Sequence, residues 1–213
     1  MKKNIYIASL LLIFAHVVEA QQYPLFTNYV INTLGFNPAV VSLDPGFEAK
    51  MTYRTQWTGI KQAPETQLFS ATYRPEKVKI GLGGYFFNDG SGRLKRTGGA
   101  GILSYTQNLA AETSVSLGVA VGYFGTTLDP NAVAADPNDP LFPQAKSGVN
   151  APDVNVGLYF KSHGFFAGVS VPQFLQKKLD FSQSPDASKT IYVRHYHALL
   201  GYRLYLGKMY LEP

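Results

Sequence analysis

Apolar and polar residues alternate with a period of two over most of the chain. Between residues 47 and 57 the odd positions run from Phe47 to Trp57 and are mostly apolar, whereas the even positions run from Glu48 to Gln56 and are polar or charged. Successive side chains of a β-strand point to opposite faces, so this segment predicts a strand with one apolar and one polar face. A helix would spread the same residues around its circumference.

The same alternation predicts further strands along the chain. They cover residues 68–74, 78–86, 99–108, 115–123, 154–161, 165–171 and 195–204, and a last one starts at Lys208. No segment has an amphipathic helical period, so we predict an all-β protein with about nine strands.

The predicted connections alternate in length. Long ones cover residues 58–65, 88–98, 125–152 and 172–189, and short ones cover residues 75–77, 109–112, 162–164 and 206–207. An outer-membrane barrel has short periplasmic turns and long exterior loops, so the pattern favours an antiparallel transmembrane β-barrel with its N-terminus in the periplasm. A soluble antiparallel sandwich, whose apolar faces meet each other, remains the alternative, because a period of two suits both folds.

The N-terminus has the order of an export signal. Lys2 and Lys3 precede an apolar run from Ile5 to Ala15, and small or modest side chains lie before Gln21. This order predicts a signal peptide over residues 1–20, and the run is too short for a membrane-spanning helix. Residues 21–45 are then expected to form a periplasmic or luminal segment, and residues 46–213 the barrel domain.

The number of predicted strands does not fit a complete barrel. Single-chain bacterial barrels have an even number of strands, whereas residues 210–213 fall inside the ninth candidate, so we expect the barrel to be truncated or incomplete at the C-terminus.

Aromatic residues at strand ends are candidates for interfacial girdles. They are Tyr53, Trp57, Tyr73, Phe86, Phe87, Tyr105, Tyr123 and Phe124.

Composition and charge exclude several classes of protein. The 213-residue chain has no Cys, which excludes disulfide scaffolds and iron–sulfur proteins, and only 15% of its residues are charged. The 19 Lys and Arg residues give a formal net charge of +5, but no basic run exceeds two residues. Nucleic-acid binders concentrate their basic residues on one stripe or helix, so we predict no nucleic-acid partner.

Few residues suggest chemistry. Residues 88–92 resemble an ion-binding loop but lack spaced carboxylates, so a hairpin turn is favoured. Asp129, Asp136 and Asp139 lie in a predicted exterior loop without a ligand motif. His195 and His197 would share a strand face, yet a metal site needs further ligands. With no catalytic motif present, we predict neither a catalytic site nor a metal or cofactor, and an outer-membrane enzyme ranks last among the functions considered.

Two spaced motifs lie near the start of the predicted mature chain. The first, P-x-F-x-x-Y-x-x-N-x-x-x-x-N-P-A, is formed by Pro24, Phe26, Tyr29, Asn32, Asn37, Pro38 and Ala39. The second, Y-R-x-Q-W-x-G-I-x-x-A-P-x-T-Q, is formed by Tyr53, Arg54, Gln56, Trp57, Gly59, Ile60, Ala63, Pro64, Thr66 and Gln67. Together they resemble the PorP/SprF family of outer-membrane proteins from Bacteroidetes, and looser matches extend over most of the mature chain.

The resemblance implies a non-enzymatic role in the type IX secretion and gliding machinery. It implies an outer-membrane barrel, embedded in lipid, that works with periplasmic ring subunits and lipoproteins or with a large secreted adhesin. A solute or hydrophobic-compound channel of porin type is the alternative function.

The motif residues have physical interpretations of their own. Asn37-Pro38-Ala39 predicts either a turn that directs the chain into the barrel or a plug that contacts the ring. Trp57 predicts an interfacial anchor. Arg54 and Gln56 share the luminal face with Glu48 and Lys50, where they predict a polar network.

Overall fold

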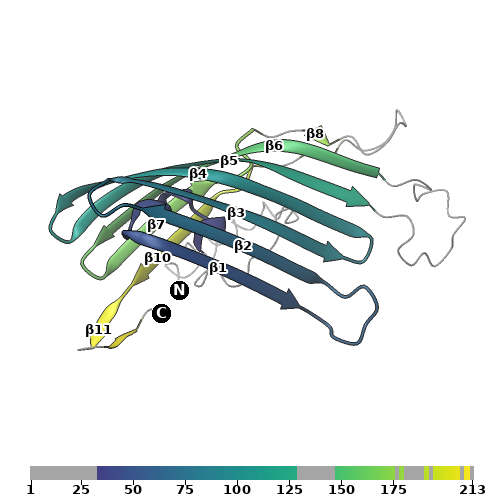
Figure 1. Cartoon of the computed structure of the whole chain (residues 1–213), viewed down its shortest axis with the longest axis horizontal. Helices are drawn as coiled ribbons and strands as arrows, with labels where there is room; N and C mark the ends of the chain where they lie inside the picture. Colours follow the sequence, from purple (N-terminus) through teal and green to yellow (C-terminus); the bar gives the residue numbers. More distant parts are fainter. Residues whose placement is uncertain are drawn as a thin grey trace, which may run out of the picture.

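The computed structural model describes residues 33–128, 147–175, 178–179, 190–191, 194–206 and 209–211. Eight strands form one antiparallel sheet in which chain order is also spatial order. The sheet curls into a half-barrel (Figure 1), which confirms the predicted all-β architecture of outer-membrane type. Its strands are β1 (Gly46–Thr55), β2 (Glu65–Arg74), β3 (Ile80–Ser91), β4 (Leu94–Ala110), β5 (Thr113–Leu128), β6 (Ser147–Ser162), β7 (Phe165–Val171) and β10 (His197–Tyr202).

Shorter elements complete the described chain. Two 3₁₀ helices, η2 (Thr33–Gly35) and η3 (Pro38–Ser42), precede β1. Two small antiparallel pairs lie outside the main sheet, β8 (Lys178–Leu179) with β9 (Thr190–Ile191) and β11 (Leu204–Leu206) with β12 (Met209–Leu211). Among the described residues, no helix is long and apolar enough to cross a membrane.

Two predicted loops differ from the structure: the one over residues 125–152 is shorter, because β5 runs to Leu128 and β6 begins at Ser147, and the one over residues 88–98 is wrong. The connection expected over residues 88–98 is a ladder in which Asn88 pairs with Thr97 and Ser91 with Leu94, so β3 and β4 meet at the two-residue turn Gly92–Arg93. Both strands continue past the apolar part of the sheet with polar side chains, and the Thr66 hydroxyl donates a hydrogen bond to Asp89 Oδ1 at 2.6 Å. Polar residues here therefore extend a hairpin instead of forming a loop.

The convex face of the sheet is apolar and exposed. Alternate residues of every strand point outward, as the period of two predicts. They include Phe47, Met51, Phe69, Tyr73, Leu82, Phe86, Leu103, Leu117, Val121, Val156, Val169 and Leu200. No second sheet covers this face in the described part of the chain, so the sandwich alternative is wrong.

Two residues proposed for the aromatic girdles lie on the other face. Phe86 is 56% exposed on the convex side, whereas its neighbour Phe87 is only 1% exposed on the concave side. The Phe124 ring also lies inside, with its centroid 5.5 Å from that of Phe87. Adjacent strand residues cannot share a face, so of the pairs Phe86–Phe87 and Tyr123–Phe124 only the first member of each points outward.

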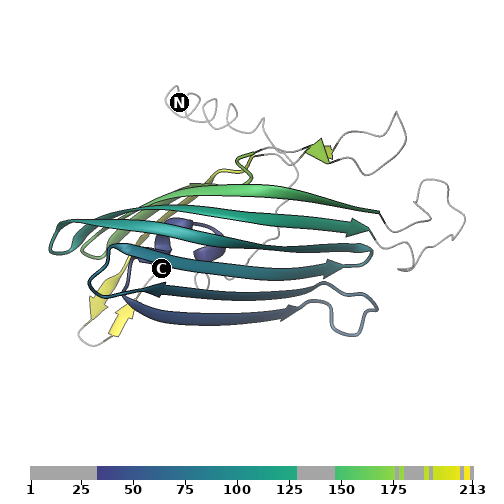
Figure 2. The ribbon, with the colours of Figure 1, turned by 45° about the horizontal axis from the view of Figure 1, so that its top comes forward.

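Part of the concave face is covered by residues that precede β1 in the chain. Figure 2 shows η2 and η3 inside the curl of the sheet. We call residues Thr33–Leu43 the plug segment. Its Leu34 and Val41 join a buried apolar cluster with the sheet residues Leu68, Tyr85, Phe87, Ile102 and Ala120. Part of the core therefore lies between the plug segment and the sheet.

Candidate functional site

The plug segment rests on small residues that the strand register aligns across the sheet. One row crosses six neighbouring strands from β3 to β10 and consists of Gly81, Ser104, Gly118, Gly157, Ser170 and His197. All but the last have a hydrogen or a short hydroxymethyl as side chain. These short side chains leave room for the backbone of the plug segment to approach the backbone of the sheet.

Glycines of this row are in direct contact with the plug segment. A Cβ atom at Gly81 would lie 2.7 Å from the Val41 carbonyl oxygen. One at Gly118 would collide with the backbone of Pro38 and Ala39, and one at Gly157 with the Asn37 side chain. Any larger residue at these positions would force the plug segment away from the sheet.

Asn37 ties the plug segment to two strands. Its Nδ2 donates to the carbonyl oxygens of Leu158 in β6, at 3.0 Å, and Val169 in β7, at 3.3 Å. Its Oδ1 accepts a hydrogen bond from the Ala39 amide at 3.0 Å and so caps the start of η3. Pro38 follows at the first helical position, where its missing N–H is not needed.

A ladder of hydroxyl groups fastens the other end of the plug segment. Ser42 shares hydrogen bonds with the hydroxyls of Ser104 and Thr106, and Thr106 shares one with Ser116. Thr106 also donates to the Ser42 carbonyl oxygen at 2.8 Å, and Ser104 to the Ala39 carbonyl oxygen at 3.0 Å. All four side chains are buried, so these bonds satisfy polar groups that water does not reach.

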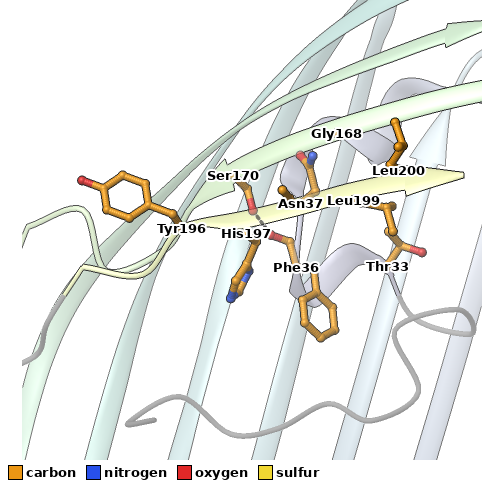
Figure 3. A pocket seen from close by; sticks show the side chains of 10 residues that line it. Thr33, Phe36, Asn37, Gly168, Ser170, Tyr196, His197, Leu199 and Leu200 are labelled. Carbon is orange, nitrogen blue, oxygen red and sulfur yellow. Dashed lines mark hydrogen bonds between the residues drawn. The ribbon is translucent and has the colours of Figure 1, made fainter. Parts of the chain in front are cut away.

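A hollow of about 470 Å³ lies beside the plug segment on the β10 side (Figure 3). Phe36, Asn37, Ser170, His197 and Leu199 contribute to its lining. The Ser170 hydroxyl donates to the Phe36 carbonyl oxygen, and the rings of Phe36 and His197 lie 5.3 Å apart between centroids. The hollow is therefore bounded by the plug segment and the end of the sheet.

The two histidines singled out as metal candidates have different surroundings. His197 lies in β10 and faces the plug segment, whereas His195 precedes the strand and shares a hydrogen bond of 2.8 Å with Gln173 Oε1. The described residues hold no group of three or more potential metal-ligating side chains. The region containing Asp129, Asp136 and Asp139 lies outside the described residues.

The family model for type IX secretion system membrane proteins PorP/SprF matches residues 18–213. The chain belongs to the PorP/SprF family. It is therefore a membrane component of the type IX secretion system, as the two motifs predicted. No curated protein and no solved structure matches the chain.

In this PorP/SprF protein, the first motif is partly visible as the plug segment. Asn37, Pro38 and Ala39 are buried, with Ala39 at 0% exposure. Tyr29 and Asn32 lie outside the described residues. The structure thus places the N-P-A residues on the concave face.

The second motif lies on β1, β2 and the loop that joins them. Tyr53 and Gln67 are exposed on the convex face, and Arg54 is on the concave face. The Gln56 amide donates to the Pro64 carbonyl oxygen at 3.0 Å, which closes the loop. Trp57 has φ 52° and Gly59 φ 98°, and Ala63 is half-buried. The two motifs are therefore not brought together into one site.

Part of the expected luminal polar network is present. Lys50 Nζ lies 2.9 Å from Glu48 Oε1 on the concave face. The hydroxyl ladder was not predicted, although Ser104 and Ser116 fall on the faces opposite the apolar residues of their strands. The sequence signal for this ladder was the presence of small hydroxyl residues and glycines at the positions of that face.

Replacing Asn37 with alanine should lower the free energy of unfolding by about 2 kcal/mol, because the cap of η3 and two bonds to the sheet are lost. Urea unfolding of the protein in lipid vesicles measures the effect. Asn108→Ala is the matched control, since Asn108 is exposed at the end of β4, and it should leave the midpoint unchanged. Equal urea midpoints for the two variants would show that the Asn37 side chain does not hold the plug segment on the sheet.

Proposed function

We propose that this PorP/SprF protein is a non-enzymatic outer-membrane component of the type IX secretion and gliding machinery, and that it positions the periplasmic ring or a secreted surface adhesin. The observation that carries the proposal is the occupied concave face, because the plug segment covers the small-residue row from β3 to β7. The convex face is apolar and suits lipid. Partners would then be bound at the rims of the sheet.

The proposed placement is the outer membrane, with a signal peptide removed after residue 20 and the N-terminus in the periplasm. The short turns at residues 111–112 and 163–164 lie at one end of the strands, and the longer connection at residues 56–64 lies at the other end, together with the short β3–β4 turn at residues 92–93. This asymmetry is typical of outer-membrane barrels, in which the short turns are periplasmic.

The channel alternative is opposed by the same contacts. A water-filled lumen requires an inner wall that is polar and open, as in porins. Here Leu34 and Val41 of the plug segment pack against apolar sheet residues such as Phe87 and Ile102. The segment is part of the hydrophobic core, and conduction along this face would require the core to open.

Affinity purification tests the proposal. The full-length protein is extracted from its native outer membrane in mild detergent, and co-purifying proteins are identified by mass spectrometry. An unrelated barrel prepared in the same way is the control. We expect ring subunits, lipoproteins or a large adhesin to be enriched over the control. A partner-free protein that conducts ions in planar bilayers would contradict the proposal and favour the channel.

A further inference from the structure

The loop between β1 and β2 holds two apolar side chains in an exposed position. Trp57 is 68% exposed and Ile60 is 63% exposed. The loop is nevertheless ordered by backbone hydrogen bonds, from Ile60 N to Trp57 O at 3.1 Å and from Ala63 N to Ile60 O at 3.3 Å. A third bond, from Gly92 N to Gln62 O at 3.1 Å, fastens the loop to the β3–β4 turn. The exposure therefore belongs to a fixed conformation.

The register of the sheet shows where the apolar part of the convex face ends. Met51, Phe69 and Phe86 are neighbours in one row across β1, β2 and β3. In the next outward-facing row Tyr53 is followed by two polar residues, Gln67 and Asn88, and in the row after that Thr55 pairs with Glu65. The apolar face thus ends about one row before the ends of β1 and β2.

Trp57 lies beyond this boundary. Thr55 lies four residues after Met51, which is about 13 Å along a strand, or about 10 Å along the membrane normal at the usual tilt. The headgroup layer on each side of the hydrocarbon core is only about 5–8 Å thick. An anchoring Trp would be expected at headgroup depth, in the row of Tyr53, yet Trp57 follows the next row, which carries the Glu65 carboxylate.

The surroundings of the loop are cationic. Within residues 56–65 and 90–95 the chain has three basic residues, Lys61, Arg93 and Lys95, and one acidic residue, Glu65. Lys61 and Lys95 are exposed. The Gln62–Gly92 hydrogen bond joins the loop that carries Trp57, Ile60 and Lys61 to the turn that contains Arg93.

We propose that Trp57 and Ile60 form a docking knob for a polypeptide partner that offers an apolar cleft edged by carboxylates. Trp is enriched among the residues that dominate the binding energy of protein interfaces, and the rim around such residues is polar. This inference rests on the proposed function, because it names the surface at which a partner of the secretion machinery docks. It replaces the interfacial anchor that the sequence predicted for Trp57.

Fluorescence tests the position of the knob, since Trp57 is the chain's single Trp. The protein is reconstituted in phosphatidylcholine vesicles with and without brominated acyl chains. We expect acrylamide in the aqueous phase to quench Trp57 strongly and brominated lipid to quench it less than 1.2-fold. The matched control carries Trp57→Phe and Phe86→Trp, and its emission should be quenched by brominated lipid. Strong lipid quenching of Trp57 itself would overturn the proposal.

Photo-crosslinking tests the partner. A photoreactive phenylalanine replaces Trp57, or Phe86 in the control, in the full-length protein in its native membrane. We expect position 57 to give a discrete polypeptide adduct that position 86 lacks, and the double variant Lys61→Glu with Lys95→Glu to lower its yield at least tenfold. Adducts with lipid alone, no adduct, or a yield unaffected by the charge reversals would overturn the docking proposal.

The two proposals can fail separately. If the adduct forms as expected but cells lacking the protein secrete and glide normally, the knob is real and the proposed function is contradicted. If cells lacking the protein lose secretion but position 57 gives no adduct, the docking proposal alone is wrong. Heat-modifiable migration of every variant on gels shows that the barrel has folded.

Discussion

Replacing Gly118 with valine is expected to force the plug segment off the concave face and to lower the free energy of unfolding by about 3 kcal/mol. A Cβ at this position would occupy the same space as the backbone of Pro38 and Ala39. Backbone held on both sides by hydrogen bonds cannot yield as the end of a long side chain can. Strand propensity alone would predict a gain in stability, because valine favours β-strands more than glycine does.

The measurement is the urea midpoint of the protein in lipid vesicles, with Gly101→Val as matched control. Gly101 lies on the convex side of β4, and a Cβ there would meet no atom within 4 Å. The control should be neutral or slightly stabilised. Limited proteolysis should cut within residues 33–43 only in Gly118→Val. The same midpoint for both variants would show that the plug segment is not seated against Gly118.

The substitution Phe87→Ala should cost about 4 kcal/mol, which is the usual penalty for removing a buried aromatic ring from a packed core. Phe87 is 1% exposed and belongs to the cluster that includes Leu34 and Val41 of the plug segment. Its ring also packs near that of Phe124, so its loss leaves a cavity between the plug segment and β3–β5.

The neighbouring substitution Phe86→Ala provides the control. Phe86 is 56% exposed on the convex face, where lipid can fill the space left by the ring. Its effect on the unfolding midpoint in vesicles should be clearly smaller than that of Phe87→Ala. Near-ultraviolet circular dichroism should report the loss of packing for Phe87→Ala. If Phe86→Ala were the more destabilising variant, the assignment of the two faces would be reversed.

Much of the sheet could be predicted because each strand has its own signal. The alternation from Phe47 to Trp57 predicts β1 to within two residues of its bounds, Gly46–Thr55. The pattern fails where both faces become polar, as at residues 88–98, since hydrophobic periodicity disappears there although the ladder continues.

The surface of the sheet on which the plug segment packs could not be predicted from the alternation of residues. Gly118, Gly157 and Ser170 are far apart in sequence and become neighbours only through register. Each glycine alone is compatible with a bulge, a turn or a close approach. Only the packed structure shows that Asn37 and the N-P-A residues fill the space that these small residues leave.

The sequence by itself determined the β architecture, the apolar convex face and the family, because alternation and spaced motifs are local properties of the chain. Only the tertiary structure decided that the concave face carries the plug segment, that Phe87 belongs to the core while Phe86 is exposed on the convex face, and that Trp57 follows the polar rows at the end of β1. These features depend on strand register and on curvature, which join residues far apart in the chain, as in the bond between Asn37 and Val169, which are 132 positions apart.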